Sequence, residues 1–136
     1  MKRFFTSLVV VLMFVSCNLD DDDANNFTLE TLPIKEAIVP DEFTYGSEQE
    51  ITIKYDLLNE CYSFYNLYYQ YEDTTRIVAV NSLLNQSAQC TEDVIEEEYT
   101  FIVRVVQHED YVFKFWKGTD ANGESIFEEI TVPVIE

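Results

Sequence analysis

Glycine, histidine and basic residues are scarce in this sequence, and their scarcity excludes several classes of site. Three glycines and one histidine among 136 residues supply neither the clustered glycines of a phosphate loop nor the cysteine and histidine set of a zinc site. A serine-based triad would have to use His108, which stands in a His-Glu-Asp stretch typical of a solvated turn. We therefore expect no enzyme, no metal and no cofactor. A carboxylate pair among the 26 acidic residues leaves a hydrolase as a remote alternative.

Positive charge is the second scarce feature. Eight basic side chains accompany 26 acidic ones, which gives a formal net charge of −18 at pH 7. Proteins bind nucleic acids and anionic lipid headgroups through clustered Lys and Arg, so the composition excludes both kinds of partner. An acidic surface favours solubility and attracts cations or basic partners.

Long apolar runs are also missing. The only extended one covers residues 4–15, is interrupted by Thr6 and Ser7, and follows Lys2 and Arg3. A membrane-spanning helix needs about 20 apolar residues, so this run is too short to span a bilayer. A charged start, a short apolar run and a small residue before a cleavage point predict a secretory signal peptide over residues 1–16.

The end of that segment, Phe14-Val15-Ser16-Cys17, resembles the lipobox of bacterial lipoproteins, with Phe at the position where Leu is usual. The resemblance implies cleavage before Cys17, a diacylglyceryl thioether on its sulfur and a further acyl chain, such as palmitate, on the new amine. Several acyl chains form a stable membrane anchor. Cleavage removes two of the eight basic side chains and leaves six against 26 acidic ones, a charge of −20. The alternative is an ordinary signal peptide with an incidental cysteine.

Four aspartates, Asp20, Asp21, Asp22 and Asp23, follow Cys17 almost directly. They resemble the acidic export signal of Bacteroidota lipoproteins, which implies a lipid-anchored protein of the outer membrane that faces the cell exterior. The alternative is a solvated acidic spacer, because blocks of like charge repel and stay extended.

The mature chain divides into a tether and one domain. Residues 24–32 are polar without a clear period, so we expect a disordered, lipidated acidic tether over residues 17–33. Residues 34–136 are enough for one hydrophobic core and too few for two.

Alternating apolar and polar residues dominate that domain, and Val, Ile, Tyr, Phe and Thr are frequent there. Asn122-Gly123 supplies the turn of a tight hairpin. The pattern predicts an all-β, immunoglobulin-like antiparallel β-sandwich of about seven strands. The predicted strands are residues 34–39, 51–56, 64–71, 76–84, 99–106, 111–116 and 126–134.

Once Cys17 carries lipid, Cys61 and Cys90 are the remaining cysteines. An exported protein matures in an oxidising compartment, so we expect these two to form a disulfide.

Aromatic side chains provide the strongest indication of binding. If Leu67, Tyr69 and their alternating partners face the core, then Phe64, Tyr68 and Trp116 face outward on strands that are candidates for neighbours. Such a row of rings suits a protein partner or the faces of sugars. The alternative is that these rings pack against loops or the core.

Asp73-Thr74-Thr75 resembles the O-glycosylation motif of Bacteroidota surface proteins, with Thr74 as acceptor. The domain as a whole is similar to small surface lipoproteins of Bacteroidota in residues 40–43, 61–69, 90, 111–118 and 132–134. This resemblance supports the immunoglobulin-like sandwich and the disulfide, and implies no activity.

The sequence thus favours a non-enzymatic surface lipoprotein that binds or supports a partner, through protein contacts with an outer-membrane protein in the first place. The alternative is a carbohydrate-binding accessory of a glycan-uptake system that uses its exposed aromatic residues.

Overall fold

The computed structural model describes residues 26–136. The predicted signal peptide, Cys17 and the four aspartates lie outside these residues. The described part contains strands and no helix, and therefore no helix long and apolar enough to cross a membrane. Its ten strands are β1 (Phe27–Leu32), β2 (Ile34–Ile38), β3 (Phe43–Thr44), β4 (Glu48–Leu57), β5 (Tyr62–Glu72), β6 (Thr75–Asn85), β7 (Ile95–Arg104), β8 (Tyr111–Thr119), β9 (Ser125–Val132) and β10 (Val134–Ile135).

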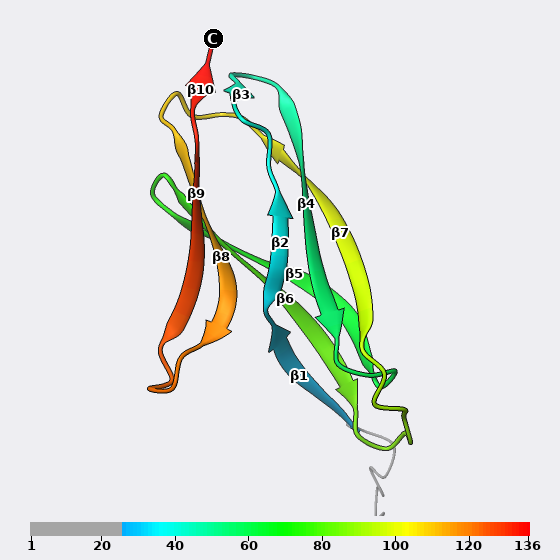
Figure 1. Cartoon of the computed structure of the whole chain (residues 1–136). Helices are drawn as coiled ribbons and strands as arrows, with labels where there is room; N and C mark the ends of the chain where they lie inside the picture. Colours follow the sequence, from blue (N-terminus) through cyan, green and yellow to red (C-terminus); the bar gives the residue numbers. More distant parts are fainter. Residues whose placement is uncertain (1–25) are drawn as a thin grey trace, which may run out of the picture.

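These strands form a β-sandwich, as the sequence predicts, although with ten strands instead of about seven (Figure 1). In the five-stranded sheet, β6 pairs with β5 along one edge and with β1 and β8 along the other, and β9 follows β8. The second sheet has the order β2-β4-β7, and β3 pairs with β10 in a small third sheet. Two pairs are parallel, β6 with β8 and β3 with β10, and the other pairs are antiparallel.

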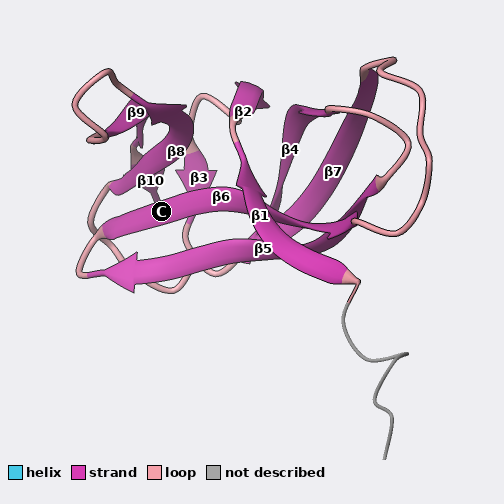
Figure 2. Cartoon of the chain, turned by 90° about the horizontal axis from the view of Figure 1, so that it is seen from below, coloured by secondary structure: helices cyan, strands magenta, loops and turns pink. Residues whose placement is uncertain are grey.

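The core lies between the five-stranded and three-stranded sheets (Figure 2). It is built by strict alternation: in β8, Tyr111, Phe113 and Phe115 are buried and the residues between them are partly exposed. Such alternation is what a strand with one solvated face requires. The opposite sheet contributes fully buried aliphatic side chains, of which Ile51 and Ile53 of β4 are examples.

Two prolines stand where the chain passes from one sheet to another. Pro33 separates β1 of the five-stranded sheet from β2 of the three-stranded sheet, and Pro133 separates β9 from β10. Proline has no N–H to donate to a ladder, so it suits these breaks. The carbonyl of Pro133 accepts a hydrogen bond from the Phe43 N–H at 2.8 Å, which holds β10 beside β3.

The expected boundary at residue 34 is wrong, because residues 27–32 form β1 and pair with β6 over their whole length. On the inward side of β1, Thr28 and Glu30 are polar and partly buried, and only Leu32 at the end of the strand belongs to the core. Glu30 accepts a hydrogen bond from the Tyr62 hydroxyl at 2.8 Å. Phe27 and Leu29 point outward and are more than half exposed. Over residues 27–30 the usual hydrophobic pattern is thus reversed, which is why this part of the sequence resembles a tether.

Alkaline solution should destabilise the fold through Tyr69, which packs against the core from β5. Burial raises the pKa of Tyr69 to about 12, whereas an unfolded tyrosine ionises near pH 10, as in model peptides. The resulting stabilisation is fully present below about pH 10 and is lost as the pH rises towards about 12. Urea unfolding at several pH values should therefore show a steeper alkaline loss in the wild type than in Tyr69→Phe. Tyr65→Phe, an exposed site on the same strand, should keep the wild-type slope, and equal slopes in all three proteins would contradict the assignment.

Candidate binding site on the outer face of the five-stranded sheet

A groove of about 370 Å³ crosses the outer face of the five-stranded sheet. All five strands of this sheet contribute side chains to the groove, which is therefore formed by the sheet and not by a loop. The lining residues are Thr31, Tyr68, Gln70, Ile77, Ala79, Trp116, Ser125 and Phe127. The volume is within the range of small-molecule sites, about 300–1,000 Å³.

Trp116 and Phe127 form one wall of this groove as a cross-strand pair of the β8–β9 hairpin. The indole Nε1–H donates to the Ser125 hydroxyl at 3.2 Å, which fixes the orientation of the ring. The register of the hairpin shifts between Trp116 and Gly118, and Gly118 has a φ of 111°. A bulge there requires backbone that glycine adopts without strain. Two further register pairs follow this bulge before the turn at residues 120–124.

Tyr68 and Gln70 line the groove from β5. The Tyr68 hydroxyl donates to the Gln70 side-chain oxygen, and the Tyr68 side chain is 42% exposed. The groove therefore combines aromatic rings with amide and hydroxyl groups that can form hydrogen bonds with a ligand. None of the residues that line it is charged.

The sequence correctly places Tyr68 and Trp116 on one face, but the placement of Phe64 beside them is wrong. The register of β5 shifts between Phe64 and Asn66, because Tyr65 is an extra residue opposite β6. This bulge reverses the alternation: Phe64 lies opposite buried Ser82 and turns inward, with its ring centroid 4.6 Å from that of Tyr99. A strict period of two along β5 cannot reveal such an extra residue.

Sequence reasoning also missed Phe127, Gln70 and Ser125. Phe127 carries a usable signal, because it lies on the far side of the Asn122-Gly123 turn from Trp116, in a hairpin already predicted. The exact cross-strand partner of Trp116 depends on the bulge at Gly118, and a single glycine does not fix the register of a hairpin. Gln70 and Ser125 carry no signal beyond their place on a strand.

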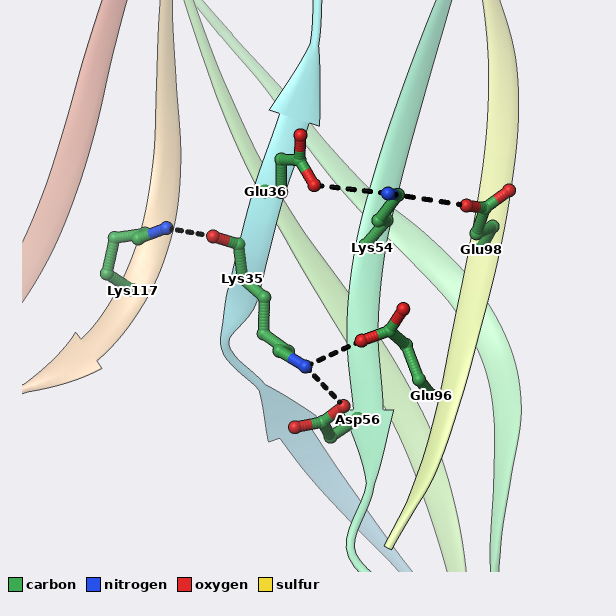
Figure 3. Close-up of polar contacts among 7 residues, drawn as sticks. All are labelled: Lys35, Glu36, Lys54, Asp56, Glu96, Glu98 and Lys117. Carbon is green, nitrogen blue, oxygen red and sulfur yellow. Dashed lines mark hydrogen bonds and ion pairs between the residues drawn. The ribbon is translucent and has the colours of Figure 1, made fainter.

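The outer face of the three-stranded sheet has the opposite character (Figure 3). Lys35 of β2 contacts Asp56 of β4 and Glu96 of β7 at 3.0 and 2.7 Å. Lys54 of β4 bridges Glu36 and Glu98 in the same way, at 3.2 and 3.8 Å.

These contacts favour the charged forms of Lys35, Lys54 and Glu96. The hydrogen bond that Lys35 donates to Glu96 raises the pKa of Lys35, with Asp56 contributing in the same direction, and the same contact lowers the pKa of Glu96. Glu36 raises the pKa of Lys54. One face of the molecule is therefore paired and ionic, and the other presents aromatic rings.

Lys117 connects the two sheets beside this ionic face. Its Nζ donates to the backbone carbonyl of Lys35 at 2.6 Å (Figure 3). It also forms an ion pair with Glu128 at 3.1 Å. The contact joins β8 to β2, whose edges approach each other there.

The structure also locates the other predicted residues. The Cys61–Cys90 disulfide is present, with the two Cα atoms 5.7 Å apart, and it joins the start of β5 to the loop between β6 and β7. Thr74 is half-buried in the β5–β6 turn, directly after Asp73, whose φ is 58°. Modification of Thr74 stays a prediction.

Within residues 26–136, no group of three or more histidine, cysteine or acidic side chains is arranged to hold a metal ion. In the Asp120–Glu124 turn, the Asp120 carboxylate accepts hydrogen bonds from the backbone N–H groups of Asn122 and Glu124 at 2.8 and 3.0 Å. The turn is thus closed by its own aspartate.

No protein-family model, no curated protein and no solved structure matches this chain. The groove is therefore interpreted from its own geometry.

Proposed function

We propose that this chain is a non-enzymatic binding module, and that its aromatic groove binds neutral glycans at the cell surface. The observation that carries the proposal is the convergence of Tyr68, Trp116 and Phe127 on one uncharged groove. Aromatic faces stack on apolar surfaces while tyrosine and tryptophan keep a polar group for hydrogen bonding.

A sugar ring presents a C–H face beside a rim of hydroxyl groups. In the groove, the rings would take the C–H face, and Gln70, Thr31 and Ser125 would exchange hydrogen bonds with the hydroxyls. The chain carries a net charge of −18, which repels acidic ligands and therefore favours neutral sugars.

The proposed display of the protein outside the cell requires that Cys17 is lipidated and that Asp20 to Asp23 act as the export signal. From Cys17 to Phe27, where β1 begins, the chain has ten residue steps. An extended chain covers at most about 3.6 Å per residue, so the anchor would hold the domain within about 36 Å of the bilayer. A captured glycan would stay close to the membrane at that distance.

Substitution of Trp116 should remove binding without unfolding the protein. On a glycan array, the full chain should bind a set of neutral glycans, and Trp116→Ala should weaken binding by about tenfold or more, the effect expected of a central aromatic contact. Tyr65→Ala, which removes an exposed ring of β5 outside the groove, should bind like the wild type. Equal binding by Trp116→Ala and the wild type, with both folded by circular dichroism, would refute the groove as the site.

Protein contact is the second candidate, and one observation favours it. Phe27 and Leu29 of β1 are 56% and 55% exposed and lie on the same face of β1 as Thr31 of the groove. The apolar surface thus extends beyond what a short glycan would cover. Cross-linking on intact cells should then yield an outer-membrane partner that is lost in a Phe27→Ser, Leu29→Ser variant, whereas glycan binding would be unaffected by that variant.

A further inference from the structure

Arg76 is the one buried basic side chain among the described residues, with 4% of its surface exposed. Its register partner across the β5–β6 hairpin is Tyr71, and both lie on the inner face of the five-stranded sheet. The guanidinium carbon is 4.4 Å from the centroid of the Tyr71 ring and 5.1 Å from that of Tyr111. The charge is thus held between two aromatic faces.

All hydrogen-bond acceptors of Arg76 are neutral. Nη1 donates to the carbonyls of Asp73 and Thr75 at 2.7 and 3.1 Å, and Nη2 donates to the Gln107 side-chain oxygen at 2.8 Å. Gln107 is itself oriented by two backbone carbonyls of the β7–β8 loop. Nε has no partner within the described part of the chain.

The missing counter-ion is conspicuous in a chain with 26 acidic residues. Lys35, Lys54, Arg104 and Lys117 form ion pairs with carboxylates, whereas Lys114 and Arg76 form none with any described residue. Of these two, only Arg76 is buried. A buried cation without a counter-ion is unfavourable, because neutral acceptors and aromatic rings replace only part of its hydration. An anion that reached Arg76 would therefore supply the counter-ion that the described residues do not provide.

Space for such an anion exists. A pocket of about 390 Å³ opens between β5 and β7. It is lined by Arg76 together with aromatic and aliphatic side chains, among them Tyr69, Tyr71, Phe101 and Tyr111. It lies on the other side of β5 from the aromatic groove, since Tyr69 and Tyr71 alternate with Tyr68 and Gln70. Arg104 also borders it but is already paired with Glu48 at 2.9 Å.

We propose that this pocket binds a small organic monocarboxylate with an apolar or aromatic body. The guanidinium of Arg76 supplies the charge complement of the carboxylate, and the aromatic and aliphatic walls cover the body. A single negative charge fits better than a phosphate dianion, because the net charge of −18 repels the dianion more strongly and the pocket offers one uncompensated cation.

The arginine Nε–H signals give a direct test by nuclear magnetic resonance. The chain has three arginines, Arg3, Arg76 and Arg104, so Arg76→Lys and Arg104→Lys variants of the ¹⁵N-labelled full chain assign the signals. Acetate, hexanoate and phenylacetate at millimolar concentration should move the Arg76 signal and the amides of residues 101–106. Phenylacetate and hexanoate should bind more tightly than acetate. The uncharged phenylacetamide and inorganic phosphate should have little effect.

Two variants separate binding from stability. Arg76→Lys keeps the charge but loses the planar fork, so phenylacetate affinity should fall by about tenfold or more. If that buried substitution prevents folding, Tyr71→Ala removes a wall residue that is 70% exposed and should also weaken binding, with Tyr65→Ala, outside the pocket, as its matched control. The proposal is overturned if none of the three carboxylates moves the Arg76 signal, or if phenylacetamide or phosphate moves it as far as phenylacetate does.

Discussion

Removal of the Cys61–Cys90 disulfide should lower the free energy of unfolding by about 3 to 4 kcal/mol. The bond closes a loop with a sequence separation of 29 residues, and the cost of closing such a loop in the unfolded chain sets this magnitude in the chain-entropy model. The loop contains the whole β5–β6 hairpin and part of the connection that leads to β7. Without the bond, the unfolded chain gains freedom and the connection is no longer fixed to the start of β5.

Urea unfolding of the wild type and of the Cys61→Ser, Cys90→Ser double variant measures this loss. The wild type treated with a reducing agent should unfold at the same urea concentration as the variant. A loss no larger than that of an ordinary surface substitution, about 0.5 kcal/mol, would mean that native contacts alone hold the connection.

Phe113→Ala should be about as damaging, with an expected loss of about 3 to 5 kcal/mol, the range for large-to-small changes of buried phenylalanine. Phe113 is a fully buried residue of β8. Its ring lies 6.0 Å from Phe43 and 5.8 Å from Phe115, centroid to centroid. Truncation would leave a cavity among rings from β3 and β8 that neighbouring side chains cannot easily fill.

Phe127→Ala is the matched control for this substitution. Phe127 is 39% exposed on the outer face of the same sheet, so its removal should cost much less stability and should weaken glycan binding. Thermal unfolding of both variants, followed by circular dichroism, distinguishes the two faces. If Phe127→Ala destabilises the protein as much as Phe113→Ala, the groove ring is part of the core and the division into core and binding face is wrong.

The class of fold could be predicted from the sequence because alternation is strong in β4 and β8, where buried and partly exposed residues alternate over residues 51–57 and 111–116. Two departures could not be predicted, and both change which side of a strand faces the core. In β5 the extra residue Tyr65 turns Phe64 inward. In β1, Phe27 and Leu29 point outward, while Glu30 points inward and accepts a hydrogen bond from the Tyr62 hydroxyl.

The aromatic groove could be predicted from the sequence only in part. Alternation correctly places Tyr68 and Trp116 on a shared face. The bulge of β5 comes before Tyr68 and the bulge of β8 comes after Trp116, so neither interrupts the alternation between these residues and the core residues next to them. Arg76 carried no signal, because a single basic residue near the start of a strand is ordinary in sequence. Its significance depends on the neutral acceptors, the two tyrosine rings and the pocket that the fold brings around it.

Trp116 itself offers the most direct measurement of the central claim, that ligand binds on the outer face of the five-stranded sheet. It is the only tryptophan of the chain, so the intrinsic tryptophan fluorescence of the protein reports on the groove alone. Titration with a neutral oligosaccharide selected on the glycan array should shift the emission to shorter wavelength and protect Trp116 from acrylamide quenching, to the same saturation point that calorimetry gives. An oligosaccharide that binds by calorimetry while the emission and quenching of Trp116 stay unchanged would place the site elsewhere and contradict the account.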